Sequence, residues 1–225
     1  MTAIHHDWGV APYATIHALQ ERLVAARARH EIPNLLLTGE HPAVITLGRK
    51  TPKDGAYAGD FEIVPVERGG EATFHGPGQI VAYPIVHLTQ SRKDLHAFQR
   101  DLEEIGIRTL ADFGLTGIRR EGLTGVWIGD RKVQSLGIAV RRWVTWHGLA
   151  LNVTTDLSAF RTFNPCGLDG NVMISMAEAL GTSPDLAAVK ASLVGHASTV
   201  LPGGPYVEGS LPATFESSPP ESQDA

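Results

Sequence analysis

The chain has 225 residues, of which 43% are hydrophobic and 19% are charged, with a net charge of −5 at pH 7. This length and composition predict one globular domain with a substantial core, and the negative charge argues against a nucleic-acid-binding protein. No long apolar run or basic N-terminal leader indicates a membrane span or a signal peptide, and the single cysteine excludes an internal disulfide and a cysteine-rich zinc cluster, so we expect a cytoplasmic protein.

The first half of the chain is expected to form two helices and several short strands. Apolar residues at three- and four-residue spacing predict amphipathic helices over residues 12–29 and 93–113. Short apolar runs bounded by Pro and Gly predict strands at residues 34–37, 43–47, 62–66 and 79–83.

A strand-rich block follows in the second half. Residues 125–128 and 132–138 flank Gly129-Asp130, which is typical of a hairpin turn. Residues 143–153 predict a further strand, in which His147 shares one face with the alternate residues that precede and follow it.

Two helices are expected after this block, near residues 171–180 and 184–200. Ser183 is the expected N-cap of the second, with Pro184 at its first helical position. The order of elements lacks regular strand–helix–strand alternation, so we predict an α+β fold in which helices face a mixed or antiparallel sheet.

The C-terminal segment differs in composition from the rest of the chain. Residues 203–225 are rich in Pro, Gly and Ser and contain acidic residues but no Lys or Arg. Such a segment buries little apolar surface, so we expect it to be disordered and the folded domain to span residues 1–202.

Cys166 is a candidate nucleophile. It lies between a proline and a glycine, whereas a cysteine that merely fills core volume usually lies among apolar residues. A reactive thiol needs a nearby base or positive charge, and His75, His147 and Lys132 are candidate partners. Spacing alone does not choose among these three.

Residues 68–79 are expected to form a glycine-rich loop between two strands. Glycines let the main chain approach a ligand, and their N–H groups can bind an anion or a carbonyl oxygen. The segment lacks the Gly-Lys-Ser/Thr of a P-loop and the three spaced glycines of a dinucleotide site. His75 and His147 are each followed by glycine, but no third ligand stands out, so we expect no metal site.

Several short motifs follow one another in order across residues 9–180. They are Glu40-His41-Pro42 with Thr46-Leu47-Gly48-Arg49; residues 68–79 with Tyr83-Pro84; Thr124-Gly125-Val126-Trp127 leading through Lys132 to Ser135-Leu136-Gly137; residues 147–153; and Pro165-Cys166-Gly167. Together they resemble the signature of the lipoyl(octanoyl)transferases. Phe74 stands where that family usually has tyrosine, a change that keeps the ring and loses a hydroxyl.

The resemblance implies a fold shared with the catalytic domains of biotin and lipoate protein ligases. It implies transfer of octanoyl from octanoyl-acyl carrier protein to a lysine of a lipoyl domain, either in a 2-oxoacid dehydrogenase or in the glycine cleavage H protein. It assigns Cys166 as the residue that carries the acyl group as a thioester and Lys132 as its partner. No ATP or other cofactor is expected, because the donor thioester is already activated.

The resemblance also implies which residues line the acyl channel. They are Arg68, Gly69, Gly70, Glu71, Ala72, Thr73, Phe74 and His75, then Ser135, Leu136 and Gly137, and finally Gly148, Leu149 and Ala150.

Three alternatives remain. An ATP-dependent lipoate ligase of the same fold would need no nucleophilic cysteine. A cysteine hydrolase would pair Cys166 with His75 or His147 and would release free fatty acid. A non-catalytic domain would only bind acyl carrier or lipoyl domains.

Overall fold

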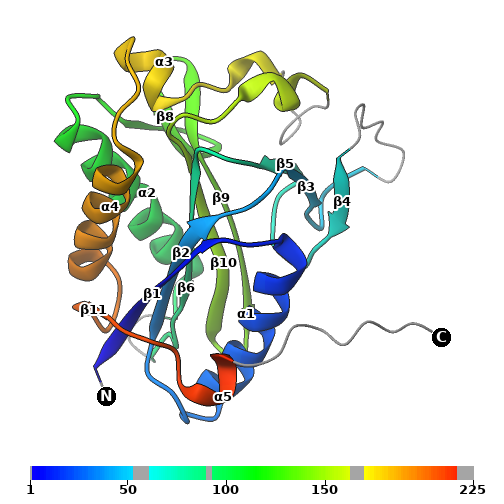
Figure 1. Cartoon of the computed structure of the whole chain (residues 1–225), viewed down its shortest axis with the longest axis vertical. Coiled ribbons are helices and arrows are strands. Elements are labelled where there is room, and N and C mark those ends of the chain that lie inside the picture. Colours follow the sequence, from blue (N-terminus) through cyan, green and yellow to red (C-terminus); the bar gives the residue numbers. More distant parts are fainter. Residues whose placement is uncertain (1, 53–60, 90–92, 163–169, 217–225) are drawn as a thin grey trace.

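The computed structural model describes residues 2–52, 61–89, 93–162 and 170–216 (Figure 1). Within these ranges the chain forms an eight-stranded mixed sheet with the strand order β11-β1-β2-β6-β10-β9-β8-β7. The strands are β1 (Ala3–Val10), β2 (Leu35–Glu40), β6 (Gln79–Ile85), β7 (Ile118–Arg120), β8 (Leu123–Ile128), β9 (Arg131–Arg141), β10 (Val144–Asn152) and β11 (Tyr206–Glu208). Strand β1 runs parallel to both β2 and β11, and the pairings from β2 through β7 are antiparallel. The predicted α+β fold with a mixed sheet is confirmed.

Helices cover both faces of this sheet. Helix α1 (Tyr13–Ala28) packs on one face, and helices α2 (Leu95–Asp112) and α4 (Leu186–Val200) pack on the other (Figure 1). The shorter helices are α3 (Met176–Leu180) and α5 (Ala213–Glu216). Helix α1 also makes the crossover that parallel strands such as β1 and β2 require.

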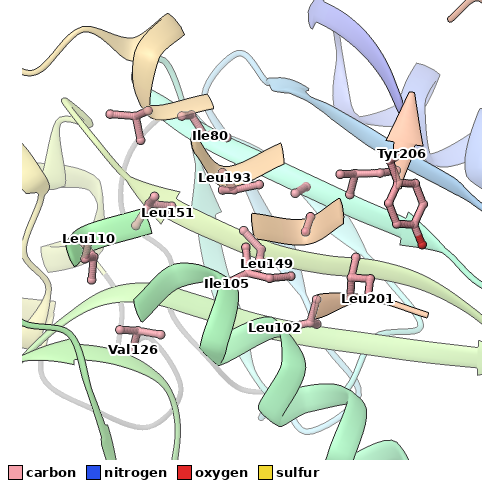
Figure 2. Close-up of a cluster of buried hydrophobic side chains, with 14 of the residues drawn as sticks. Ile80, Leu102, Ile105, Leu110, Val126, Leu149, Leu151, Leu193, Leu201 and Tyr206 are labelled. Atoms are coloured by element: carbon pink, nitrogen blue, oxygen red, sulfur yellow. The ribbon is translucent and has the colours of Figure 1, made fainter. Parts of the chain in front are cut away.

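The main core lies between the sheet and helices α2 and α4. Figure 2 shows Leu102 and Ile105 of α2 and Leu193 of α4 beside Leu149 and Leu151 of β10. Burial of one such leucine stabilises the fold by about 1.5–3 kcal/mol. Apolar side chains on α2 and α4 that pack against the sheet therefore form the main stabilising contact of the large sheet.

Strand β10 is buried along its whole length because helices cover both of its faces. Leu149 and Leu151 belong to the core under α2 and α4, and Trp146 and Ala150 to the cluster under α1. His147 breaks the alternation: its φ of 52° turns the ring onto Trp146, with ring centroids 4.5 Å apart. The prediction that His147 shares a face with Leu149 is therefore wrong.

A second sheet lies beside the N-terminal end of α1. In the described ranges it has three strands in the order β4-β3-β5, namely β4 (Glu62–Pro65), β3 (Val44–Leu47) and β5 (Ala72–His75). Tyr13 at the start of α1 packs with Val44 and Val66 and joins the two parts. The small sheet lies at one end of the large one (Figure 1).

Local signals located most elements but missed some. Helices α1 and α2 and strands β2, β3, β4, β6, β8, β9 and β10 lie where they were predicted. Strand β1 was missed because His5, His6 and Asp7 interrupt its apolar character. Strand β5 lies within the segment expected to be a loop. Gly69 and Gly70 just before it suggested a loop, but antiparallel pairing with β3 holds residues 72–75 in a strand.

The start of the last long helix was also misjudged. Asp185, rather than Ser183, is the N-cap of α4, because its carboxylate accepts a hydrogen bond from the N–H of Ala187. The preceding helix α3 begins at Met176, where Ser175 caps the N–H of Glu178.

The expectation of disorder from residue 203 onward is wrong for the segment up to residue 216. Strand β11 joins the large sheet through β1, and its Tyr206 is buried in the main core. Leu211 is buried under α1. Residues 217–225 lie outside the described part of the chain. Among the described residues, no helix has the length and apolarity needed to cross a membrane.

Candidate functional site

A pocket lies on the α1 side of the large sheet, where the small sheet approaches it. We call it the central pocket; its cavity volume is about 30 Å³. It is lined by Tyr13, Arg68, Thr73, His75, Tyr83, Ser135, Leu136, Gly137, His147, Gly148, Leu149 and Ala150. All three segments expected to line the acyl channel therefore contribute to one cavity.

The floor of the central pocket is a strip of small residues. Gly148 pairs with Gly137, and Ala150 pairs with Ser135, across the β9–β10 ladder. Alternate residues of a strand share a face, so these two adjacent pairs leave a groove with no bulky side chain. A methyl group at Gly137 would lie 2.7 Å from Cδ of Arg68, so glycine is needed there for Arg68 to cross above.

Arg68 forms the roof of the pocket and is itself buried. Its guanidinium donates hydrogen bonds to the carbonyl oxygen of Thr46 (2.8 Å), to the hydroxyl of Thr46 (2.9 Å) and to the carbonyl oxygen of Glu71 (2.7 Å). The N–H of Gly69 donates to the carbonyl oxygen of Ile138 at 3.0 Å. These bonds fasten the glycine-rich segment between β3 and β9.

Histidines and tyrosines line the end of the pocket near α1. His75 Nδ1 lies 2.7 Å from the side-chain oxygen of Gln79, and the hydroxyl of Tyr83 lies 3.0 Å from Nε2 of His41. Burial lowers the pKa of His75 to about 3 and of His147 to about 2, so both imidazoles are neutral at physiological pH.

Lys132 lies on β9 and is 4% exposed. Its Nζ is 5.9 Å from the centroid of the Trp127 ring. Gly125 provides the space for the lysine side chain, because a methyl group at Gly125 would lie 2.6 Å from Cε of Lys132. The buried carboxylate of Glu103 accepts a hydrogen bond from the N–H of Gly125 at 3.1 Å and fixes that strand. Residues of the Thr-Gly-Val-Trp motif thus surround the side chain of Lys132.

A second pocket, here called the lysine pocket, adjoins the central pocket. It is lined by Lys50, Gly69, Gly70, Glu71, His96, Gln99, Gly122, Leu123, Thr124, Trp127, Lys132, Leu136, Gly137 and Ile138. Leu136 and Gly137 line both pockets. The groove of small residues and the lysine therefore lie on two sides of the same short stretch of β9.

Two of the residues expected in the acyl channel face elsewhere. Alternation along β5 directs Thr73 and His75 to the central pocket, while Ala72 and Phe74 pack into a separate cluster with Phe160. The rings of Phe74 and Phe160 meet edge to face, with centroids 5.6 Å apart. Phe74 is therefore a packing residue, in line with its lack of a hydroxyl.

Two pocket residues had no role in the sequence-based prediction. Tyr83 belongs to a motif that was recognised, but nothing in the sequence showed where its side chain points. Tyr13 has no local signal, because it lies at the start of a helix far from the other residues. Cys166 lies outside the described residues.

Comparison with known proteins agrees with this arrangement. Residues 12–198 match the family described as lipoyl protein ligase A/B catalytic domain. The chain belongs to this family.

Relatives in the lipoyl protein ligase A/B catalytic domain family include an octanoyltransferase of Syntrophotalea carbinolica. It is 46% identical over 195 residues, which cover 87% of this chain and 92% of the relative. An octanoyltransferase of Gloeobacter violaceus is 50% identical over 163 residues, covering 71% and 73% of the two chains. The chain is therefore similar in sequence, over most of its length, to proteins named octanoyltransferase.

Solved structures of this catalytic fold also resemble the chain. Lipoate-protein ligase A bound with ATP has a TM-score of 0.73 at 16% identity, covering 96% of this chain and 92% of the ligase. A biotin protein ligase from Aquifex aeolicus, in complex with biotin and ATP, has a TM-score of 0.52 at 12% identity, covering 88% and 69%. The predicted fold, shared with lipoate and biotin protein ligases, is confirmed.

Proposed function

We propose that the chain transfers an octanoyl group from octanoyl-acyl carrier protein to a lysine of a lipoyl domain. The observation that carries this proposal is the groove of small residues in the central pocket, since Leu136 and Gly137 line both that pocket and the pocket that contains Lys132. A groove without bulky side chains suits a straight hydrocarbon chain. Burial of eight carbons would contribute about 5–6 kcal/mol to binding, at about 0.8 kcal/mol for each CH₂ group.

In the proposed reaction the acyl group passes through Cys166. The thiolate attacks the thioester carbonyl of the donor, the carrier leaves as a thiolate that takes a proton from the Lys132 ammonium, and an acyl-enzyme thioester forms. This exchange is nearly balanced, because a thioester is both broken and formed. The amine of the acceptor lysine then attacks the acyl carbonyl, loses a proton and forms an amide, while the Cys166 thiolate leaves. The gain in amide stability drives the transfer.

Lys132 is the proposed partner of Cys166. Its ammonium would stabilise the thiolate by charge and would then give its proton to the departing carrier thiolate. The resulting amine would accept the proton of the attacking lysine in the second step. Burial supports both roles, since water screens the charge less and the side chain is held by Trp127 and Gly125. Later in the chain, the N–H of Ile174 donates to the carbonyl oxygen of Lys132, so the segment at Ile174 contacts β9 at the lysine.

The proposal includes the setting of the reaction. The donor is octanoyl-acyl carrier protein, and the acceptors are lipoyl domains of 2-oxoacid dehydrogenases and the glycine cleavage H protein. No ATP is consumed, and the reaction takes place in the cytoplasm.

The alternatives receive less support. Likeness to lipoate ligases at 16% identity concerns the fold, whereas the relatives at 40–50% identity are named octanoyltransferases. A cysteine hydrolase would need His75 or His147 as a base, and imidazoles with pKa values of about 3 and about 2 accept a proton from a thiol poorly.

The test uses the full chain with octanoyl-acyl carrier protein and no ATP, followed by intact-protein mass spectrometry. We expect one octanoyl adduct, located on Cys166 by peptide mapping, which is discharged as an amide when a lipoyl domain is added. The Cys166→Ser variant is the control and should carry no thioester adduct. Absence of an adduct on the unmodified chain, with activity restored by ATP and octanoate, would favour the ligase instead.

A further inference from the structure

Three side chains from distant segments meet at one edge of the central pocket. They are His17 on α1, Glu67 just after β4, and His147 on β10. Their ligand atoms, two imidazole nitrogens and one carboxylate oxygen, all lie within 4.8 Å of one another. His17 Nε2 lies 3.0 Å and His147 Nε2 lies 3.7 Å from the same oxygen, Oε2 of Glu67.

These separations are close to those found in a metal site. Zinc bonds to imidazole nitrogen and carboxylate oxygen are about 2.0–2.2 Å long, so ligand atoms at two corners of a tetrahedron lie about 3.4 Å apart. The two measured separations bracket that value. Small side-chain movements would therefore place a cation within reach of all three atoms.

The state of His147 provides an independent observation. The residue is 2% exposed, and its Nε2 is buried without a hydrogen-bond partner among the described residues. The hydroxyl of Tyr13 lies 3.4 Å from the other ring nitrogen, Nδ1. A buried ring nitrogen is normally satisfied, and this unpartnered Nε2 lies 3.7 Å from Oε2 of Glu67, where one ligand can contact both groups.

The surroundings suit an imidazole ligand. In a metal-bound histidine the ring nitrogen that does not bind the metal is usually hydrogen-bonded to an oxygen. In His147 the hydroxyl oxygen of Tyr13 lies beside that nitrogen, Nδ1. The ring of His147 stacks on Trp146 and that of His17 on Tyr13, so both rings are fixed in place.

We propose that His17, Glu67 and His147 form a binding site for a divalent transition-metal ion, with Zn²⁺ as the preferred ion. Two imidazoles and one carboxylate favour zinc over magnesium or calcium, which select oxygen ligands. The remaining coordination position would be open to water. The positive charges of Arg49 and Arg68, which act on His147, oppose a cation, so the affinity is expected to be below that of a closed structural zinc site.

The site would connect three parts of the fold. It would join α1 to β10 and to the segment that leads into Arg68, the roof of the central pocket. Because His147 also lines that pocket, a bound ion would fix one wall of it. The inference does not depend on the proposed acyl transfer.

Zinc binding is measured on the full chain by competition with a chromophoric chelator, after alkylation of Cys166 so that its thiol does not bind the metal. We expect one equivalent of Zn²⁺ for the unmodified sequence. His17→Gln and Glu67→Gln should each weaken binding at least tenfold, and both replace side chains that are partly exposed, at 19% and 43%. Circular dichroism confirms that each variant is folded.

His196→Gln is the matched control. His196 Nε2 lies 2.8 Å from a carboxylate oxygen of Asp112 on the surface, and these two are not part of any three-ligand group in the described ranges. This variant should bind zinc as tightly as the unmodified chain. The proposal is overturned if no saturable binding occurs, if both His17→Gln and Glu67→Gln bind normally, or if His196→Gln weakens binding equally. None of these results bears on acyl transfer, which is assayed separately with the donor.

Discussion

Lys132 is a buried lysine, and the residues around it leave room for its side chain. Gly125 leaves room for its side chain, and Trp127 lies beside its ammonium group. A lysine just after a hairpin turn would normally extend into water, as its position in the sequence suggests. Its burial is the strongest residue-scale reason for the role proposed for it.

Replacing Lys132 tests this role. Lys132→Met should reduce formation of the acyl-enzyme at least about 100-fold, because it removes both the charge and the proton acceptor. Lys132→Arg should also transfer poorly, because arginine keeps the charge but does not act as a base. Single-turnover assays separate acylation from transfer. Full activity of Lys132→Arg in a folded protein would refute the proton-transfer role while leaving the role of charge.

The buried histidines predict how stability depends on pH. Burial lowers the pKa of His41 to about 4 and of His75 to about 3, whereas an unfolded imidazole titrates near 6.5. Below pH 6.5 the unfolded chain therefore binds protons that the folded chain does not, so stability is lost as the pH falls from about 6.5 toward these values.

Between pH 7 and pH 5.5 the loss should be on the order of 1 kcal/mol for each such histidine. Urea unfolding at the two pH values measures it. His75→Gln should reduce the loss by one histidine's share, since glutamine does not titrate and its amide can still donate to Gln79. An equal loss in the variant and the unmodified chain would contradict this account.

At the scale of elements, the site depends on the register of the β9–β10 hairpin. The pairing of Gly148 with Gly137 and of Ala150 with Ser135 sets four small residues side by side. A shift by one residue would turn these residues to the other face and put leucines in their place. The acyl groove is thus a property of two paired strands, and neither strand forms it alone.

Gly137→Ala tests the groove. The added methyl group would meet Cδ of Arg68 at 2.7 Å and the carbonyl oxygen of Gly69 at 3.2 Å, and the guanidinium of Arg68 is held by its own hydrogen bonds. We expect a shallower groove that favours shorter acyl chains, with about a fourfold loss in kcat/KM for each methylene that no longer fits. Kinetics with hexanoyl and octanoyl donors measures the ratio.

Gly195→Ala on α4 is the matched control for this substitution. Nothing lies within 4 Å of a methyl group at that position, and alanine favours a helix over glycine. This variant should keep the chain-length preference of the unmodified protein. The same change of preference in both variants would show that the effect does not arise in the groove.

At the scale of the whole molecule, the C-terminal segment completes the large sheet. Strand β11 pairs in parallel with β1, and Tyr206 fills part of the main core (Figure 2). The chain therefore returns to its own N-terminal strand after the last long helix, and the fold extends beyond the boundary at residue 202 that composition suggested.

Truncation after residue 202 should consequently destabilise the fold. The loss of the buried Tyr206 side chain alone costs about 3 kcal/mol or more, by analogy with other large aromatic residues. Chemical unfolding measures the difference from the full chain. Val207→Ala is the control, because Val207 is 52% exposed and its truncation should cost little. A truncated chain with unchanged stability would show that residues 1–202 suffice.

The sequence by itself determined the α+β class, most of the helices and strands, and the segments that meet at the site. Apolar periodicity is a local property, so α1, α2 and the β9–β10 strands could be located without any structure. The ordered motifs, from the glycine-rich segment to Lys132, also led to the family that the comparisons then established.

The tertiary structure decided what local signals do not contain. Pairing with distant strands made β1, β5 and β11, and packing against Phe160 turned Phe74 away from the pocket. The position of Tyr13 in the pocket and the meeting of His17, Glu67 and His147 depend on contacts between residues far apart in the chain. No periodicity within one segment encodes such contacts, because they form only when helix α1 and the two sheets pack together.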